Sequence, residues 1–297
     1  MKILLTGSTG QLGNSIINSK PKNIELIITY REKLDLLNPE NCEKLVILEK
    51  PDWIINCAAY TNVDQAENNI ELSNITNGLA PEAFAKAISK IKGKLLHISS
   101  DYVFDGKQNY PYQTNQKINP INQYGVSKAL GEKLIEKNTI NNAKAYILRT
   151  GWLIGPVGKN FIVTMLKLHS EKDLINVVSD QFGAPTFTKD LANVCWDIVK
   201  LKNSEESLRI LHWSDSGIAS WYDLAEATGE IGLELGILKR RAEVIPIKTK
   251  QYPSPAKRPR YSLLDTKETS KLIGRVPNHW RNNLKKLLIE YKKLQIQ

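Results

Sequence analysis

Short apolar runs alternate along the first half of the chain with longer segments in which apolar side chains recur every three or four residues. Short runs of this kind are typical of buried parallel strands, and the longer period is typical of helices that cover a sheet. The expected strands span residues 3–6, 24–29, 53–57, 94–99 and 144–149. The expected helices span residues 39–49, 72–91 and 124–137, the second with a break near Gly78 and Pro81. The alternation predicts an α/β fold with a Rossmann-type, doubly wound parallel sheet.

Beyond Gly151 the pattern loosens into shorter elements separated by Gly and Pro, as at residues 183–185 and 252–255. This change predicts a smaller mixed α/β substrate-binding region toward the C-terminus. We therefore expect an NAD(P)-binding Rossmann domain over residues 1–150. The remainder, residues 151–297, is expected to be mainly substrate-binding and interleaved with the first domain.

Three glycines, Gly7, Gly10 and Gly13, follow the first expected strand at three-residue spacing. A strand that turns through glycines into a helix presents free backbone N–H groups and the positive end of the helix dipole, which together suit a pyrophosphate. The first turn is one residue longer than in the common G-x-G-x-x-G pattern, and glycines also close ordinary strand-to-helix junctions. The position at the first junction of an alternating chain favours dinucleotide binding.

The end of the second expected strand reads Thr29-Tyr30-Arg31. An acidic residue at this place binds the adenosine ribose of NAD, whereas an arginine accommodates the 2′-phosphate of NADP. Arg31 therefore predicts NADPH as the cofactor, with NADH as the second candidate. The alternative is that Arg31 is a solvated loop residue and that Glu32 or Asp35 binds the ribose.

A second constellation pairs Tyr124 with Lys128 and follows Ser100 at the end of the fourth expected strand. Residues four apart on a helix share a face, so the phenol and the ammonium can point into one cleft. A nearby ammonium favours ionised tyrosine and moves its pKa from about 10 toward the working pH. Lys128 could also hold a nicotinamide ribose, and Ser100 could donate to a carbonyl oxygen. An exposed Tyr–Lys pair on an amphipathic helix is the alternative, because Y-x-x-x-K is common by chance.

Together these motifs resemble the extended short-chain dehydrogenase/reductase family, and within it the dTDP-4-dehydrorhamnose reductases. Residues 99–106, Ser-Ser-Asp-Tyr-Val-Phe-Asp-Gly, are similar to the S-T-D-Y-V-F-x-G segment of those reductases. Further similar segments are residues 56–64, 148–152, 158–161, 180–186, 220–223 and 252–259. The resemblance covers nearly the whole chain.

The resemblance implies that NAD(P)H reduces the 4-keto group of dTDP-4-dehydro-L-rhamnose to give dTDP-L-rhamnose for cell-surface polysaccharide. It makes Tyr124 the proton donor, Lys128 the partner of the tyrosine and the ribose, and Ser100 the residue that orients the carbonyl. The implied cofactor-binding residues are Gly7, Gly10, Gln11, Leu12, Gly13, Tyr30, Arg31, Asp35, Leu36, Ala58, Ala59, Tyr60, Tyr124 and Lys128. The implied substrate-binding residues are Thr61, Val63, Ser100, Asp101, Tyr124, Trp152 and, for the diphosphate, Lys257 and Arg258.

Two departures from the family pattern affect what is expected. Ser100 replaces a threonine, which keeps the hydroxyl but loses a methyl that restricts its rotamers, so we expect looser orientation and a lower rate. Some members bridge their dimer with Mg²⁺ held by carboxylates, one of them just after the glycine motif. Asn14 and Ser15 occupy that neighbourhood here, so no metal is predicted.

The composition narrows the classes of partner. A net charge of +10 attracts polyanions, yet Lys and Arg are scattered among Glu and Asp as on an ordinary solvated surface. The basic cluster at residues 257–260 lacks the interleaved aromatic side chains of a single-strand binding groove. We therefore expect a small nucleotide-sugar ligand as the partner and no nucleic acid.

The spacing of the cysteines and histidines and the length of the apolar runs bear on metal binding and on the compartment of the protein. The three cysteines show no C-x-x-C spacing and the four histidines no H-x-x-x-H spacing, which predicts reduced thiols and no metal site. No stretch reaches membrane-spanning length, and the first apolar run is too short for a secretory signal. We expect a cytoplasmic protein without a membrane partner, and a homodimer is left open.

Two other functions remain open at this point. One is a different sugar-nucleotide enzyme of the superfamily, an epimerase or a 4,6-dehydratase. A dehydratase would need an acid pair, whereas Ser100 and Asp101 supply one carboxylate. The other is a regulatory subunit like the methionine adenosyltransferase β subunit, against which the intact Tyr124 and Lys128 argue.

Overall fold

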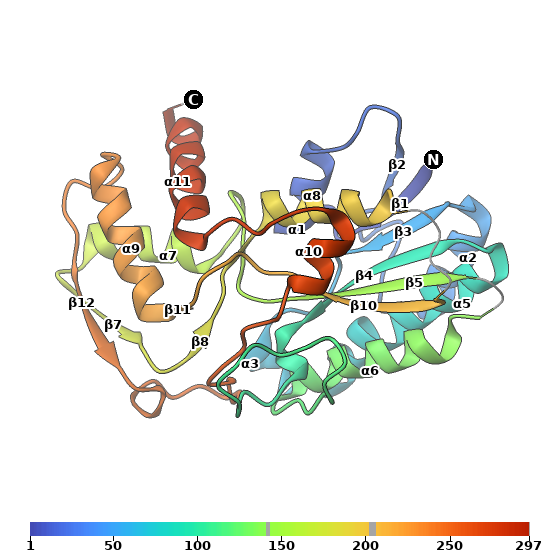
Figure 1. Ribbon diagram of the computed structural model, residues 1–297, viewed down its shortest axis with the longest axis horizontal. Helices are drawn as coiled ribbons and strands as arrows, with labels where there is room; N and C mark the ends of the chain where they lie inside the picture. The colour runs from blue at the N-terminus through green and yellow to red at the C-terminus, as the bar shows by residue number, and fades with distance from the viewer. Residues whose placement is uncertain (141–142, 202–205, 297) are drawn as a thin grey trace.

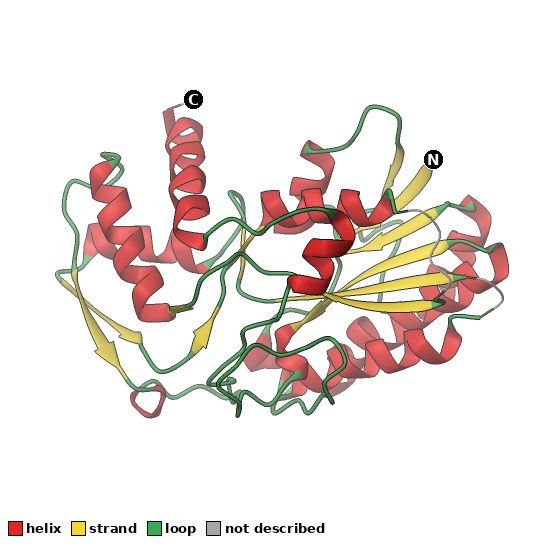
Figure 2. Ribbon diagram, viewed as in Figure 1, coloured by secondary structure: helices red, strands yellow, loops and turns green. Residues whose placement is uncertain are grey.

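The computed structural model describes residues 1–140, 143–201 and 206–296, and within them six parallel strands form one twisted sheet (Figures 1 and 2). The strand order is β10-β5-β4-β3-β1-β2. The strands are β1 (Lys2–Thr6), β2 (Glu25–Ile28), β3 (Trp53–Asn56), β4 (Lys94–Ser100), β5 (Lys144–Thr150) and β10 (Leu208–His212). The order of connection reverses between β1 and β3, and in an open α/β sheet such a reversal opens a crevice at the carboxyl ends of the strands.

Helices cover both faces of this sheet. On one face lie α1 (Gln11–Asn18), α8 (Thr188–Val199) and α10 (Lys267–Ile273), and on the other α2 (Pro39–Glu49), α5 (Ala80–Ile91) and α6 (Gln123–Asn138) (Figure 1). Successive side chains of a strand point to opposite faces, so Ile3 and Leu5 pack against the first layer and Leu4 against the second. All three are fully buried. The expected Rossmann-type fold is confirmed.

The expected long helix at residues 72–91 is divided. It consists of α4 (Ile70–Asn74), a π-helical turn at Ile75–Leu79 and α5. Gly78 lets α6 approach this turn, because a Cβ there would lie 2.7 Å from Leu130 Cδ2. Asn77 in the same turn accepts a hydrogen bond from the Tyr60 N–H at 2.8 Å and donates one to Ser127 Oγ at 2.9 Å. Such π-turns are frequent at functional sites, and this one supports a loop that carries expected site residues.

The C-terminal part of the chain builds a smaller body beside the sheet, drawn at the left of Figure 1. Its helices are α7 (Phe161–Glu171), α9 (Trp221–Glu234) and α11 (Trp280–Ile296). Its short strands pair as β12 (Glu243–Ile247) with β7 (Leu174–Val178), β11 (Ala219–Ser220) with β8 (Phe182–Gly183), and β6 (Leu153–Ile154) with β9 (Thr186–Phe187). The short helical elements α3 (Val63–Ala66), Asp101–Val103 and Thr249–Gln251 complete the described structure.

Three elements from the second half of the sequence, α8, β10 and α10, belong in space to the first sheet and its cover. The domain division at residue 150 stays a prediction. None of the helices built from the described residues combines the length and the apolar character needed to cross a bilayer.

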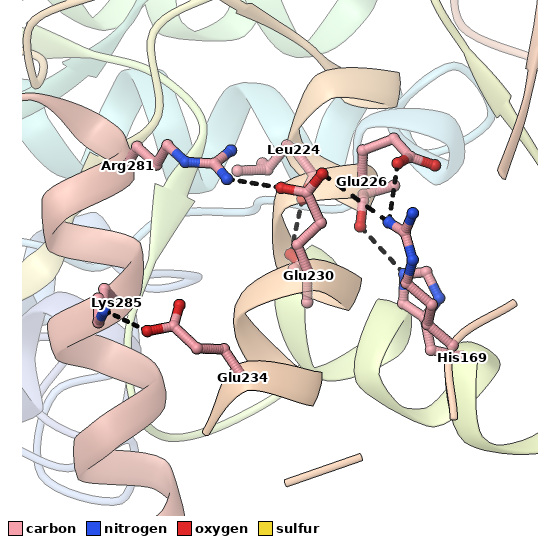
Figure 3. A network of polar contacts seen from close by, with 10 residues as sticks. His169, Leu224, Glu226, Glu230, Glu234, Arg281 and Lys285 are labelled. Atoms are coloured by element: carbon pink, nitrogen blue, oxygen red, sulfur yellow. Dashed lines mark hydrogen bonds and ion pairs between the residues drawn. The ribbon is translucent and has the colours of Figure 1, made fainter. Parts of the chain in front are cut away.

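Exposed ion pairs connect α9 to α11 (Figure 3). Arg281 lies 2.6 Å from Glu230, and Lys285 lies 2.6 Å from Glu234. All four side chains are about half exposed, so each pair contributes little to stability. The apolar side chains between the helices, among them Leu224 and Leu284, carry the packing.

Candidate active site

A cleft of about 940 Å³ opens at the carboxyl ends of β1, β3, β4 and β5. Its volume falls in the range of small-molecule and cofactor sites. Of the residues expected to form the site, those that line the cleft are Gly7, Gly10, Gln11, Leu12, Gly13, Tyr30, Arg31, Asp35, Leu36, Ala58, Ala59, Tyr60, Thr61, Val63, Ser100, Asp101, Tyr124, Lys128 and Trp152. Lys257 and Arg258 do not line it. The structure therefore brings together residues that are far apart in the sequence.

The glycine loop forms the floor of one end of the cleft. Gly7 has φ +70°, and a Cβ there would lie 2.6 Å from the Ala58 nitrogen. A Cβ on Gly13 would lie 2.1 Å from the Gly7 carbonyl oxygen, so only glycine fits. Helix α1 begins after Gly10 without a side-chain cap and without an acidic residue in its first turn. Its first N–H groups and positive dipole end are thus available to an anion, and this loop fits a pyrophosphate.

Arg31 and Asp35 stand together at the rim of the cleft beside β2. Arg31 Nε lies 3.7 Å from Asp35 Oδ1, and the arginine side chain is 76% exposed. The same Asp35 oxygen accepts the Leu37 N–H at 3.1 Å. An exposed arginine at this rim can turn toward a ligand at little cost, because surface ion pairs are weak.

Tyr124 lies in the first turn of α6, where Asn122 caps the helix by accepting the Gly125 N–H at 2.8 Å. Burial raises the pKa of Tyr124 to about 12, although the neighbouring Ser100 hydroxyl favours the ionised form. Ser100 Oγ donates to Asp101 Oδ1 at 3.0 Å. Burial also raises the pKa of Asp101 to about 6, against hydrogen bonds from Ser262 and Ser100.

Lys128 is 1% exposed, and its Nζ donates to the Ile98 carbonyl oxygen at 2.7 Å. Burial lowers the pKa of Lys128 to about 8, while Glu132 and Cys57 favour its charged form. The expectation that the pKa of Tyr124 lies closer to the working pH than its ordinary value is wrong for the ligand-free molecule. Lys128 is held against β4, and desolvation of the phenol dominates.

Two tryptophans form a wall on the side of the cleft that faces the smaller body. The Trp152 and Trp221 rings stack at 3.6 Å between centroids with an interplanar angle of 3°. Trp152 has φ +49°, a strained conformation for a bulky residue, and Gly183 leaves room for its indole. Sequence reasoning assigned no site role to Trp221, which lines the cleft, although residues 220–223 were part of the family resemblance.

The segment that carries Lys257 and Arg258 is anchored beside the cleft. Arg258 Nη2 lies 3.0 Å from Asp64 Oδ2, and the Lys257 carbonyl oxygen accepts from Asn122 Nδ2 at 2.7 Å. The structure thus gives Arg258 a carboxylate partner, 194 residues earlier in the chain, that sequence reasoning did not foresee. Contact of either side chain with a diphosphate stays a prediction.

A buried ion pair joins α6 to the sheet behind the cleft. Arg149 on β5 lies 2.7 Å from Glu132 on α6, and the two side chains are 3% and 5% exposed. Ser99 Oγ on β4 donates to the other oxygen of Glu132 at 2.5 Å. Because Ser99 precedes Ser100 and Glu132 lies one turn beyond Lys128, this network fixes α6 against β4 and β5.

Comparisons with known proteins agree over nearly the full length of the chain. A family model described as RmlD substrate binding domain matches residues 1–293. The spore coat polysaccharide biosynthesis protein SpsK of Bacillus subtilis is 37% identical over 291 residues, covering 97% of each chain. A dTDP-4-dehydrorhamnose reductase structure from Clostridium acetobutylicum is 37% identical, with a TM-score of 0.88 and 100% of both chains covered. The Bacillus anthracis reductase of that name, in complex with NADP, is 32% identical, with a TM-score of 0.87, covering 97% of this chain and 99% of its own.

Proposed function

Because the chain belongs to the RmlD substrate binding domain family, we propose that it is an NADPH-dependent dTDP-4-dehydrorhamnose reductase. It reduces the 4-keto group of dTDP-4-dehydro-L-rhamnose and yields dTDP-L-rhamnose. The observation that carries this proposal is one cleft in which Ser100, Tyr124 and Lys128 lie beside a glycine loop suited to a dinucleotide.

One set of residues binds the cofactor and the sugar, and another set transfers the proton. When bound, the nicotinamide supplies a hydride. The glycine loop and the N-terminus of α1, which line the cleft, would hold the pyrophosphate, and Arg31 at the rim would meet the 2′-phosphate. The Trp152 and Trp221 wall, with Asp101, bounds the space left for the sugar.

Tyr124 provides the proton that the developing alkoxide requires. With a pKa of about 12 it is protonated at neutral pH and can donate to the oxygen as negative charge grows there. Ser100 orients the same oxygen by a hydrogen bond. The ammonium of Lys128 favours the tyrosinate that remains, since it is the cation that lines this part of the cleft beside Tyr124.

The direct test mixes the purified protein with NADPH and enzymatically generated dTDP-4-dehydro-L-rhamnose. The absorbance of NADPH should fall in step with the appearance of dTDP-L-rhamnose. Turnover of a sugar nucleotide without added cofactor would favour an epimerase. Co-purification with a larger enzyme and no oxidation of NADPH would favour a regulatory subunit.

Replacing Arg31 with alanine should lower the preference for NADPH over NADH. A charge-assisted hydrogen bond to the 2′-phosphate contributes about 1.5–3 kcal/mol, so the ratio of kcat/KM for the two cofactors should fall about 10- to 100-fold. Lys33→Ala is the matched control, because Lys33 lies nearby and its ammonium pairs with Glu49 at 3.0 Å. An unchanged ratio in Arg31→Ala would assign Arg31 to the solvated rim.

The rate should fall as the pH is raised through about 8. Lys128 has its pKa lowered to about 8 by burial, so it loses its charge as the pH passes this value. The neutral amine no longer favours tyrosinate, and kcat decreases. Tyr124, with a pKa of about 12, stays protonated over this range. A kcat profile measured from pH 6 to pH 10 that stays flat through the basic side would contradict this role of Lys128.

A further inference from the structure

A buried row of polar side chains leads across the sheet to Lys128. Lys128 Nζ lies 3.2 Å from His97 Nε2, and His97 Nδ1 lies 2.9 Å from Asn56 Nδ2. Asn56 Oδ1 accepts from Thr6 Oγ1 at 2.6 Å. None of the four side chains belongs to a residue more than 1% exposed. The row therefore links the strand that precedes the glycine loop to the lysine of the active site.

The strand register places these residues side by side. Thr6 on β1 is opposite Asn56 on β3, and Asn56 is opposite His97 on β4. The interior of a parallel sheet usually carries Val, Ile and Leu at such positions, and a buried polar group costs free energy unless it is hydrogen-bonded. Thr6 and Asn56 end their strands, whereas His97 lies inside β4, and three polar residues in one buried row are not explained by packing.

We propose that His97 is a positioning residue that fixes Lys128 Nζ and holds the proton on it, and that Asn56 and Thr6 fix the imidazole in turn. The inference rests on the proposed function, in which Lys128 acts as an ammonium. Burial holds the pKa of His97 well below its usual value, so the ring is neutral and one of its nitrogens accepts. For Nε2 to accept from the ammonium, Nδ1 carries the proton and Asn56 presents Oδ1 to it, which is the amide turned by half from the orientation with Nδ2 against Nδ1. In that orientation Asn56 Nδ2 faces Thr6 Oγ1, which can accept from it.

Other groups that face Lys128 act on it less directly. Glu132 lies one turn further along α6, but its carboxylate is bonded to Arg149 and Ser99. Cys57 follows β3, and burial raises the pKa of its thiol, so it stays neutral. Tyr124 lies one turn before Lys128 and is protonated. Among the described residues, His97 is the side chain within hydrogen-bonding distance of Nζ.

A pair of substitutions separates the contact with Lys128 from the contact with Asn56. In His97→Gln the terminal amide reaches the place of Nε2 and keeps an acceptor for Lys128. In His97→Asn the shorter side chain reaches only the place of Nδ1 and keeps the bond to Asn56. A charge-assisted hydrogen bond to the ammonium is lost only in the second variant, so its Lys128 should deprotonate at lower pH.

The measurement is an NMR titration of the Lys128 ¹³Cε resonance in the ligand-free protein, assigned by its absence in Lys128→Met. We expect a wild-type midpoint near 8. The midpoint of His97→Gln should stay within about half a unit of it, and that of His97→Asn should fall by about one unit or more. The basic side of the kcat profile should move by the same amount.

A wild-type midpoint in His97→Asn, or a higher one, would overturn the proposal. If His97→Asn does not fold, Asn56→Leu replaces it, because the ring then loses the partner of Nδ1 and the Lys128 midpoint should again fall. An unshifted midpoint in Asn56→Leu would likewise overturn the proposal. Because the titration needs no turnover, a shifted midpoint in a protein without reductase activity would reject the proposed function and keep the positioning role.

Discussion

Replacing Tyr124 with phenylalanine is expected to lower kcat about 10²- to 10⁴-fold, the contribution of one positioned acid to proton transfer. The ring and its edge-to-face contact with Tyr102, at 5.7 Å between centroids, are kept, so only the proton donor is removed. The Kd for NADPH should change little, because in the proposed function the glycine loop and Arg31, which line another part of the cleft, hold the cofactor. Single-turnover rates and fluorescence titration with NADPH measure the two effects separately.

Tyr102→Phe is the matched control for this variant. It also removes one phenol from the same cleft, but the Tyr102 hydroxyl interacts with Arg258 rather than with Ser100. Its kcat should therefore fall far less than that of Tyr124→Phe. Equal losses in the two variants would mean that neither phenol is the specific proton donor.

Replacing Arg149 with methionine is expected to lower the free energy of unfolding by about 3–5 kcal/mol, because it leaves the carboxylate of Glu132 buried without its cation. Guanidinium or urea unfolding, followed by circular dichroism, measures the loss. Replacing Glu132 as well, in Glu132→Leu/Arg149→Met, should recover part of it, since an apolar pair needs no desolvated charge.

Lys285→Met provides the comparison at the surface (Figure 3). Its pair with Glu234 has a similar N–O distance of 2.6 Å, but the side chains are 47% and 58% exposed. Solvent screens such a pair, and its loss should cost less than about 1 kcal/mol. A loss in Lys285→Met as large as that in Arg149→Met would show that burial is not what makes the inner pair important.

The sequence predicted five of the six strands of the sheet, the edge strand β2 among them, and missed the edge strand β10. Each of the five expected strands is present with ends that differ by no more than one residue, because apolar runs such as residues 53–55 have no other stable place than a covered sheet. Strand β10 was missed. Among the described strands it pairs with β5 alone, and it carries Arg209 and His212 among apolar residues, so its pattern is weaker than that of an interior strand.

Local motifs predicted the two ends of the cleft, and features that depend on long-range contacts were missed. The π-helical turn depends on Leu130 packing over Gly78, and the partner of Arg258 lies at Asp64, far earlier in the chain. The pKa of Tyr124 depends on how deeply the ring is buried, which no spacing of tyrosine and lysine reveals. Trp221 enters the cleft only because α9 begins against Trp152.

During synthesis on the ribosome, the sheet stays one strand short until residue 212 has emerged, because β10 completes the outer edge of β5. The apolar side of α1 likewise stays uncovered until α8 has been synthesised, because Leu191 and Val194 of α8 pack in the same core cluster as α1. A nascent chain that has reached only residue 150 thus exposes an unpaired strand edge and apolar surface, the features through which incomplete chains associate. The cofactor crevice can therefore mature only late in translation, when most of the polypeptide is already available.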